Sequence, residues 1–124
     1  NHISEIFSVE DLIPSAGQGI ISLQCRDNDK ETISLLKNTN HKETYLRAIA
    51  ERNVLKVLEG DCETAVGVHA LVNENIITLE AELFSLDGTK RFYEKKSTDV
   101  NDAKKLGQEI GQILKFKSNN SYKK

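Results

Sequence analysis

The chain has 124 residues, 38% of them hydrophobic and 29% charged, with a formal net charge of −2. This length suffices for one domain with a hydrophobic core, and the slightly acidic balance argues against a nucleic-acid partner. No apolar run approaches the ~20 residues that span a membrane, and two cysteines make no disulfide framework.

The amino end carries no cationic, apolar secretory leader, so a reducing cytoplasm is the expected compartment. The sequence contains no Met, as expected of a fragment that begins within a longer protein.

The first part of the chain does not predict a complete domain. Residues 20–23 are mostly apolar and follow a glycine, which predicts a short buried strand. Asn28, with Glu31 three residues later, predicts the capped start of a helix that ends at Asn38. One strand and one helix cannot enclose a core. We expect the free edge of this strand to make the isolated fragment self-associate.

From Asn40 onward the pattern predicts a domain of its own. Asn40 and Glu43 form a second capping pair, and a helix with one apolar face follows until Gly60 supplies the left-handed position that ends it. The apolar face consists of Leu46, Ile49, Ala50, Val54, Val57 and Leu58.

Three strands are expected next. Residues 66–72 and 77–83 each alternate apolar and other side chains, and the turn 73–75 joins them. Asp87-Gly88 is typical of a hairpin turn, and residues 91–95 provide the returning strand.

A last helix completes the predicted domain. Asp99 or Asn101 caps this helix, its inner side runs from Val100 to Leu114, and the end from Lys115 is expected to fray. The order helix, three strands, helix predicts an α+β fold, in which helices cover one face of a small three-stranded antiparallel sheet.

Cys62 is the first candidate for chemistry. It lies between the predicted helix end and the next strand, where a thiol on a tight turn can be reached by a ligand and held still from both sides. On position alone, a cysteine is more often a packing or incidental residue. The other candidates are weaker: Cys25 reads as a core or edge thiol, and the three histidines lack the spacing of a zinc site. We expect no metal.

Two sets of residues together resemble the signature segments of one family, the porphobilinogen deaminases or hydroxymethylbilane synthases. The first set is Glu51-Arg52, Leu58-Glu59-Gly60, Cys62 and Val66-Gly67, and the second, upstream, is Pro14 to Gly19 with Gln24-Cys25-Arg26-Asp27. The similarity runs from about Asp11 to Leu114.

The resemblance implies a three-domain transferase of tetrapyrrole, porphyrin and heme biosynthesis. Residues 1–39 would be the strand–helix remnant of its second, α/β domain, and residues 40–124 its third, cofactor-anchoring domain. The family polymerises four porphobilinogen molecules into the linear tetrapyrrole hydroxymethylbilane with release of ammonia. Growth starts from a covalent dipyrromethane cofactor, held by a thioether to the cysteine that Cys62 matches. The full-length enzyme is expected to be a monomer.

The same resemblance places the catalytic carboxylate and most substrate-binding arginines upstream of this chain. No catalytic residue is therefore expected in the fragment, which alone should be inactive and lack its cofactor. Gln18 and Gly19 are placed against the cofactor, because glycines allow close backbone approach and Gln18 offers an amide; on its own, such a loop is a turn before a strand. Arg52 either binds a carboxylate of the cofactor or forms an intramolecular ion pair, for example with Glu59.

The chain departs from the family at two positions beside the cysteine. Asp61 stands where a small residue is usual, and its charge should disfavour the Cys62 thiolate. Ala65 replaces a proline, which should loosen the start of the strand. These departures leave an alternative open, in which the chain is a non-catalytic small α+β binding or interaction module.

Overall fold

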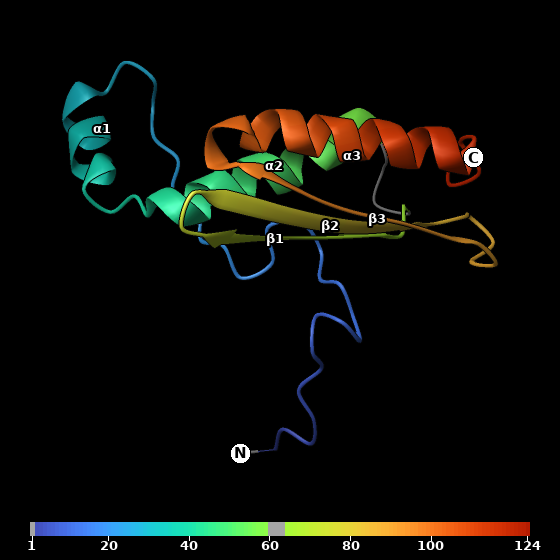
Figure 1. Cartoon of the computed structure of the whole chain (residues 1–124). Coiled ribbons are helices and arrows are strands. Elements are labelled where there is room, and N and C mark those ends of the chain that lie inside the picture. Colours follow the sequence, from blue (N-terminus) through green and yellow to red (C-terminus); the bar gives the residue numbers. More distant parts are fainter. Residues whose placement is uncertain (1, 60–63) are drawn as a thin grey trace.

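The computed structural model of the chain describes residues 2–59 and 64–124. Helices α2 and α3 lie side by side over one face of a three-stranded antiparallel sheet, which confirms the predicted α+β fold (Figure 1). The elements are α1 (Lys30–Lys37), α2 (Lys42–Leu58), β1 (Val66–Asn73), β2 (Ile76–Phe84), β3 (Arg91–Asp99), the 3-10 turn η1 (Val100–Asp102) and α3 (Ala103–Ser118). None of the helices in the described part of the chain has the length and apolar character to cross a membrane.

The sheet has the order β1-β2-β3, so each strand pairs with its neighbour in sequence. Asn73 pairs with Ile76 across a tight turn in which Glu74 has φ 55°. The predicted alternation is confirmed, because every second side chain of β1 and β2 belongs to the core; Val66 and Val72 are partly buried there, and the others are fully buried. The fully buried side chains are Val68, Ala70, Ile77, Leu79, Ala81 and Leu83. β3 continues to Asp99, beyond the end predicted for it at residue 95.

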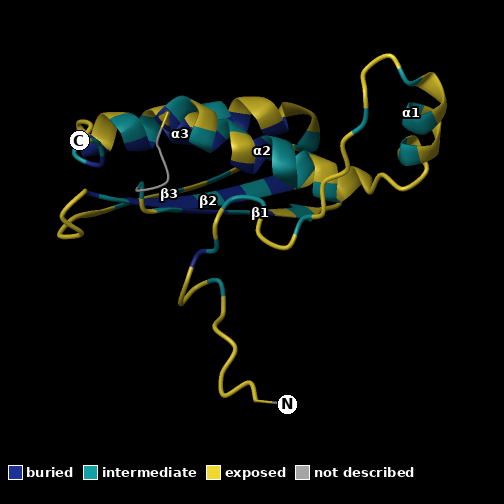
Figure 2. Ribbon diagram, turned by 180° about the vertical axis from the view of Figure 1, so that it is seen from behind, coloured by how far each residue is buried: buried dark blue, intermediate teal, exposed yellow. Residues whose placement is uncertain are grey.

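The two long helices approach each other closely at two glycines of α3. A Cβ atom on Gly107 would collide with the carbonyl oxygen of Ala50, and one on Gly111 would lie 2.8 Å from the Cβ of Val57. Larger residues there would push α3 away from α2. The apolar faces of both helices close the core over the sheet (Figure 2).

The first predicted helix cap is displaced by one residue. Asp29, not Asn28, caps α1, and its carboxylate accepts both the N–H of Thr32 at 3.0 Å and the Thr32 hydroxyl at 2.8 Å. A charged acceptor that receives two hydrogen bonds is stronger than a neutral amide one residue earlier.

The cap of α2 is displaced in the same way. His41, not Asn40, accepts the N–H of Thr44 through Nδ1 at 3.3 Å. At the other end of α2 the left-handed residue is Glu59, with φ 52°, and Gly60, for which that role was predicted, lies outside the described residues. Of the two caps offered for the last helix, Asp99 caps the η1 turn that leads into α3.

The predicted strand at residues 20–23 is wrong for this chain. No strand is formed there, and Ile21 and Leu23 are 88% and 61% exposed. The physical reason is that no strand among the described residues pairs with this segment, so its backbone has no ladder to join. Self-association of the fragment stays a prediction, but its basis is now the exposed apolar side chains of this segment and no longer a free strand edge.

A short stretch ahead of that segment packs on the sheet. Ile13 is 7% exposed, and the carbonyl of Pro14 accepts the N–H of Val68 at 2.8 Å. The backbone of Ile13 lies so close to Gly67 that a Cβ there would come within 2.6 Å of the Ile13 oxygen. The division at residue 39 stays a prediction, but residues 13–17 contact the domain that follows it.

The carboxyl end is ordered, and the prediction that it frays from Lys115 is wrong. Helix α3 continues to Ser118, and Tyr122 beyond it is 1% exposed. The reason is that this tyrosine has a place in the core, which a chain rich in Lys and Asn does not suggest.

Candidate functional site

Cys62 itself lies outside the described residues, which stop at Glu59 and resume at Thr64; the departure at Asp61 lies there too. The structure does define both ends of the segment that carries this thiol. One end is the last turn of α2, with Leu58 buried in the core. The other is Ala65, whose carbonyl accepts the N–H of Phe84 at 3.0 Å. The chain is therefore tied to the core four positions before the cysteine, at Leu58, and three positions after it, at Ala65.

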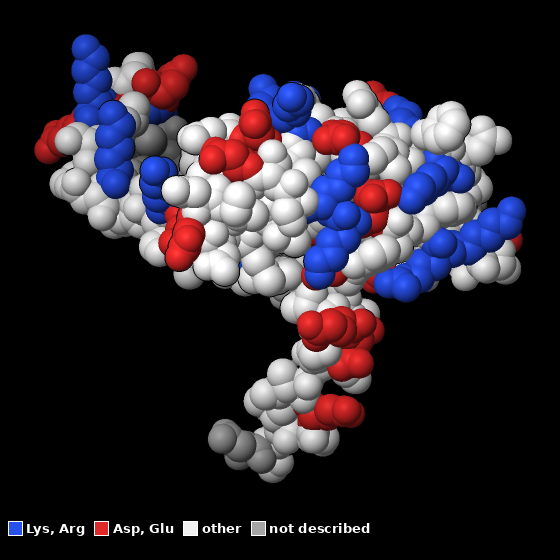
Figure 3. All heavy atoms as spheres, viewed as in Figure 1, with Lys and Arg blue, Asp and Glu red and all other residues white. Residues whose placement is uncertain are grey.

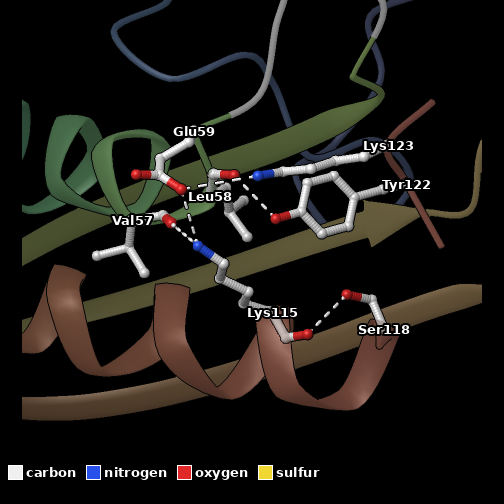
Figure 4. A network of polar contacts seen from close by, with 7 residues as sticks. All are labelled: Val57, Leu58, Glu59, Lys115, Ser118, Tyr122 and Lys123. Carbon is white, nitrogen blue, oxygen red and sulfur yellow. Dashed lines mark hydrogen bonds and ion pairs between the residues drawn. The ribbon is translucent and has the colours of Figure 1, made fainter. Parts of the chain in front are cut away.

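Two lysines meet at the end of α2 on the carboxylate of Glu59. Lys115 Nζ lies 2.9 Å from Glu59 Oε2 and donates to the carbonyl of Val57 at 3.2 Å (Figure 4). Lys123 Nζ lies 3.7 Å from the same carboxylate oxygen. Glu59 therefore pairs with these two lysines, and the ion pair suggested between Glu59 and Arg52, both of which the structure describes, is not formed.

The charges of this cluster are mutually stabilised. The hydrogen bond from Lys115 and its positive charge lower the pKa of Glu59 from its ordinary value of 4.5. The same contact raises the pKa of Lys115 above 10.5, and burial raises the pKa of Tyr122 above 10.0. At neutral pH the end of α2 therefore carries a formed ion pair beside a protonated tyrosine.

The loop Gly17–Gly19 is held against the middle of α2. The N–H of Gly17 donates to Glu51 Oε2 at 2.6 Å, and Glu51 is only 2% exposed. Gly17 and Gly19 have φ 77° and 76°, and no atom of the described residues lies within 4 Å of the position a Cβ would take on either. The loop therefore presents backbone to open space, with Gln18 exposed between the glycines.

Arg52 follows Glu51 on α2 and has an exposed side chain. Within residues 2–59 and 64–124 it forms no ion pair, so its guanidinium can meet a carboxylate from outside the described chain. The structure brings the loop of Gln18 and the helix of Arg52 together through Glu51. In the sequence, Glu51 stands out only as part of a motif, and its connecting role was not predicted. The one indication of that role was that its carboxylate follows Ala50, a position predicted to be buried.

Cys25 is placed elsewhere. Its half-buried, free thiol lines a hollow of about 570 Å³ between residues 20–25, α1 and the start of α2. The hollow is lined mainly by apolar groups and includes Ile33 and Tyr45. Cys25 thus has neither a core position nor a strand edge, in contrast to the expectation.

Charged side chains of both signs are interspersed on the face shown in Figure 3. Several lysines of the described chain are paired, among them Lys96 with Glu109 at 2.6 Å and Lys117 with Glu94 at 2.7 Å. Among the described residues, no group of three His, Cys, Asp or Glu side chains is arranged to hold a metal ion.

Comparison with known proteins gives a consistent result. Residues 45–115 match the family described as "Porphobilinogen deaminase, C-terminal domain". The porphobilinogen deaminase of Desulforamulus reducens is 40% identical over 112 residues, which are 90% of this chain and 36% of that protein. Those of Chloroherpeton thalassium and Coxiella burnetii are each 35% identical, over 92% of this chain and 38% and 37% of their own lengths. The chain therefore spans little more than a third of these relatives.

Proposed function

Because this chain belongs to the porphobilinogen deaminase family, we propose that it is the cofactor-anchoring part of a full-length transferase that polymerises porphobilinogen into hydroxymethylbilane and releases ammonia. The observation that carries the proposal is the position of Cys62. It falls inside the matched residues 45–115, on a segment whose two ends are tied to the core.

The chemistry of the anchor favours a thiol. A thiolate is a soft nucleophile that can add to an activated methylene carbon, and the resulting thioether resists the hydrolysis that cleaves an ester. The dipyrromethane supplies the primer on which the chain of pyrroles grows. Cys62 holds the primer and takes no part in turnover.

Three described residues that the family pattern assigns to the cofactor carry groups suited to binding it. The open side of Gly17 and Gly19 leaves room for close approach to the backbone, and the Gln18 amide offers both a donor and an acceptor. Arg52 can pair bidentately with a carboxylate of the bound pyrroles. We assign Gln18, Gly19 and Arg52 to cofactor binding on these grounds.

The proposal leaves acid–base catalysis to the part of the enzyme that this chain does not contain. A positioned acid or base contributes ~10²- to 10⁴-fold to a rate, so the isolated chain should not consume porphobilinogen. We further propose that the full-length enzyme is cytoplasmic, in keeping with the two cysteines of this part of it, and that it is a monomer, as the resemblance to the family implies.

The proposal is tested by intact-mass analysis of the full-length protein and two variants. Wild type and Cys25→Ser should carry the added mass of a dipyrromethane, and Cys62→Ser should not, because a hydroxyl is far less available as an anion at neutral pH. If the added mass survives in Cys62→Ser, the anchor is wrong. A bare wild-type protein supports instead the non-catalytic binding or interaction module, which the departures at Asp61 and Ala65 favour.

A further inference from the structure

The chain reverses direction after α3 and returns to the end of α2. Asn119 and Asn120 have φ 47° and 58°, a left-handed conformation that asparagine adopts more readily than most residues. The N–H of Ser121 then donates to the carbonyl of Ser118 at 2.9 Å. This geometry places the next residue, Tyr122, against α2.

The same turn is fixed from its other side. The carbonyl of Ser121 accepts the N–H of Leu86 at 2.8 Å, in the connection between β2 and β3. Tyr122 is fully enclosed, and its hydroxyl donates to the carbonyl of Leu58 at 2.8 Å (Figure 4). The turn is therefore a built part of the domain, anchored to the β2–β3 connection and directed at the end of α2.

The contacts of Tyr122 and Lys115 satisfy carbonyls that the helix cannot satisfy itself. The last four carbonyls of a helix have no intrahelical partner; here Val57 is bonded by Lys115 and Leu58 by Tyr122. The residue that follows, Glu59, is left-handed although it is not glycine, a conformation that persists where surrounding contacts impose it. The last turn of α2 and the direction in which the chain leaves it thus depend on two side chains from the carboxyl end.

We propose that Tyr122 and Lys115 are positioning residues for the segment that carries Cys62. By fixing the exit of α2, they fix the point from which that segment starts, and so they speed covalent attachment of the primer. Without them the last turn of α2 opens more often, so the starting point of that segment is less fixed and attachment of the primer is slower. This inference rests on the proposed function.

The first test measures the exit of α2 directly, without reference to the cofactor. The amide N–H of Glu59 donates to the carbonyl of Leu55 at 3.0 Å, so its hydrogen exchange reports opening of the last turn. In the full-length protein, Tyr122→Phe keeps the ring and removes one hydrogen bond, which should speed exchange at Glu59 roughly fivefold. The amide of Val54, deeper in α2, should be unchanged.

The second test measures primer attachment. The fraction of full-length protein that carries the primer mass is followed over time after expression is induced, for Tyr122→Phe combined with Lys115→Met. We expect slower acquisition in this double variant and recovery when Lys115→Arg, which retains the donors, replaces Lys115→Met. Lys117→Met is the matched control, because Lys117 lies on the same helix but pairs with Glu94; it should change neither readout.

The outcomes separate the inference from the proposed function. Unchanged hydrogen exchange at Glu59 in the double variant would show that Tyr122 and Lys115 do not fix the last turn of α2, and overturns the inference. Faster exchange with unchanged primer acquisition overturns the positioning role and leaves the anchor intact. A wild-type protein that never acquires a primer contradicts the proposed function, and the positioning role falls with it.

Discussion

Glu51 and Gly17, which lie far apart in the sequence, are joined by a hydrogen bond of 2.6 Å from the glycine N–H to the buried carboxylate. The second oxygen of Glu51 accepts the N–H of Ala70 at 2.9 Å. One side chain of α2 therefore holds both the loop in front of the domain and the middle of β1. Hydrogen bonds to a charged acceptor are among the stronger ones in proteins.

Glu51→Gln should lower the free energy of unfolding by roughly 1–3 kcal/mol. A glutamine side chain has only one acceptor oxygen, so its NH₂ group would face one of the two backbone N–H donors. Chemical denaturation of the chain measures the loss. Glu43→Gln, at an exposed position of the same helix, is the control; an equal effect from both variants would contradict the connecting role of Glu51.

Gly107→Ala should destabilise the fold, because the added methyl group collides with the backbone of Ala50 in α2. Overpacking of this kind costs ~1–3 kcal/mol. Thermal unfolding followed by circular dichroism detects the change. Gln112→Ala, on the exposed side of α3, should shift the free energy by no more than about 0.5 kcal/mol. If Gly107→Ala is as stable as this control, the close helix approach is wrong.

The hairpin between β2 and β3 should contribute to acid sensitivity through Asp87. Hydrogen bonds from the Ser85 hydroxyl and from the N–H and hydroxyl of Thr89 lower its pKa from 3.8 to about 2. Because the folded pKa is depressed, its stabilising effect is complete above about pH 4 and is lost as the pH falls toward 2. In Asp87→Asn, the urea concentration at the midpoint of unfolding should therefore decrease less between pH 4 and pH 2 than it does in the wild type.

Asp102→Asn serves as the control for that experiment, because the Asp102 side chain makes no capping hydrogen bond. If the urea midpoint of Asp87→Asn falls as steeply between pH 4 and pH 2 as that of the wild type, the hairpin hydrogen bonds do not lower the pKa of Asp87.

A chain that begins at Asn40 should fold as a monomer, but with lower stability than the longer chain. It lacks the Pro14 carbonyl that bonds Val68 and the Gly17 N–H that bonds Glu51, and each lost hydrogen bond costs ~1 kcal/mol. Denaturant midpoints and sedimentation measure both properties. A chain that begins at Asp11 is the control, since it keeps these contacts. Failure of the shorter chain to fold would show that residues 1–39 belong to the same core.

The sequence predicts the parts of this fold that depend on local patterns. Alternation in β1 and β2 and the three- and four-residue spacing in α2 follow from which side chains face the core, and both are confirmed. Two helix caps lie one residue after the predicted positions, at Asp29 and His41, because neighbouring polar residues compete for the same N–H groups. Such competition is decided by geometry that spacing alone does not contain.

The site was less predictable, because its contacts join distant parts of the chain. The bond between Tyr122 and Leu58 spans 64 positions, and no periodicity connects a tyrosine in a polar tail with a helix end. The strand expected at residues 20–23 failed for the opposite reason. Its apolar pattern is local, but a strand exists only where a partner supplies hydrogen bonds.

The two outer strands of the sheet are protected against the addition of further strands in different ways. On β1, the Pro14 carbonyl already occupies the N–H of Val68. On β3, charged side chains project to both faces of the sheet: Lys95 pairs with Glu80, and Lys96 pairs with Glu109. Charged edge strands are a common defence against fibril growth. The domain can therefore present an open sheet without becoming a template for aggregation.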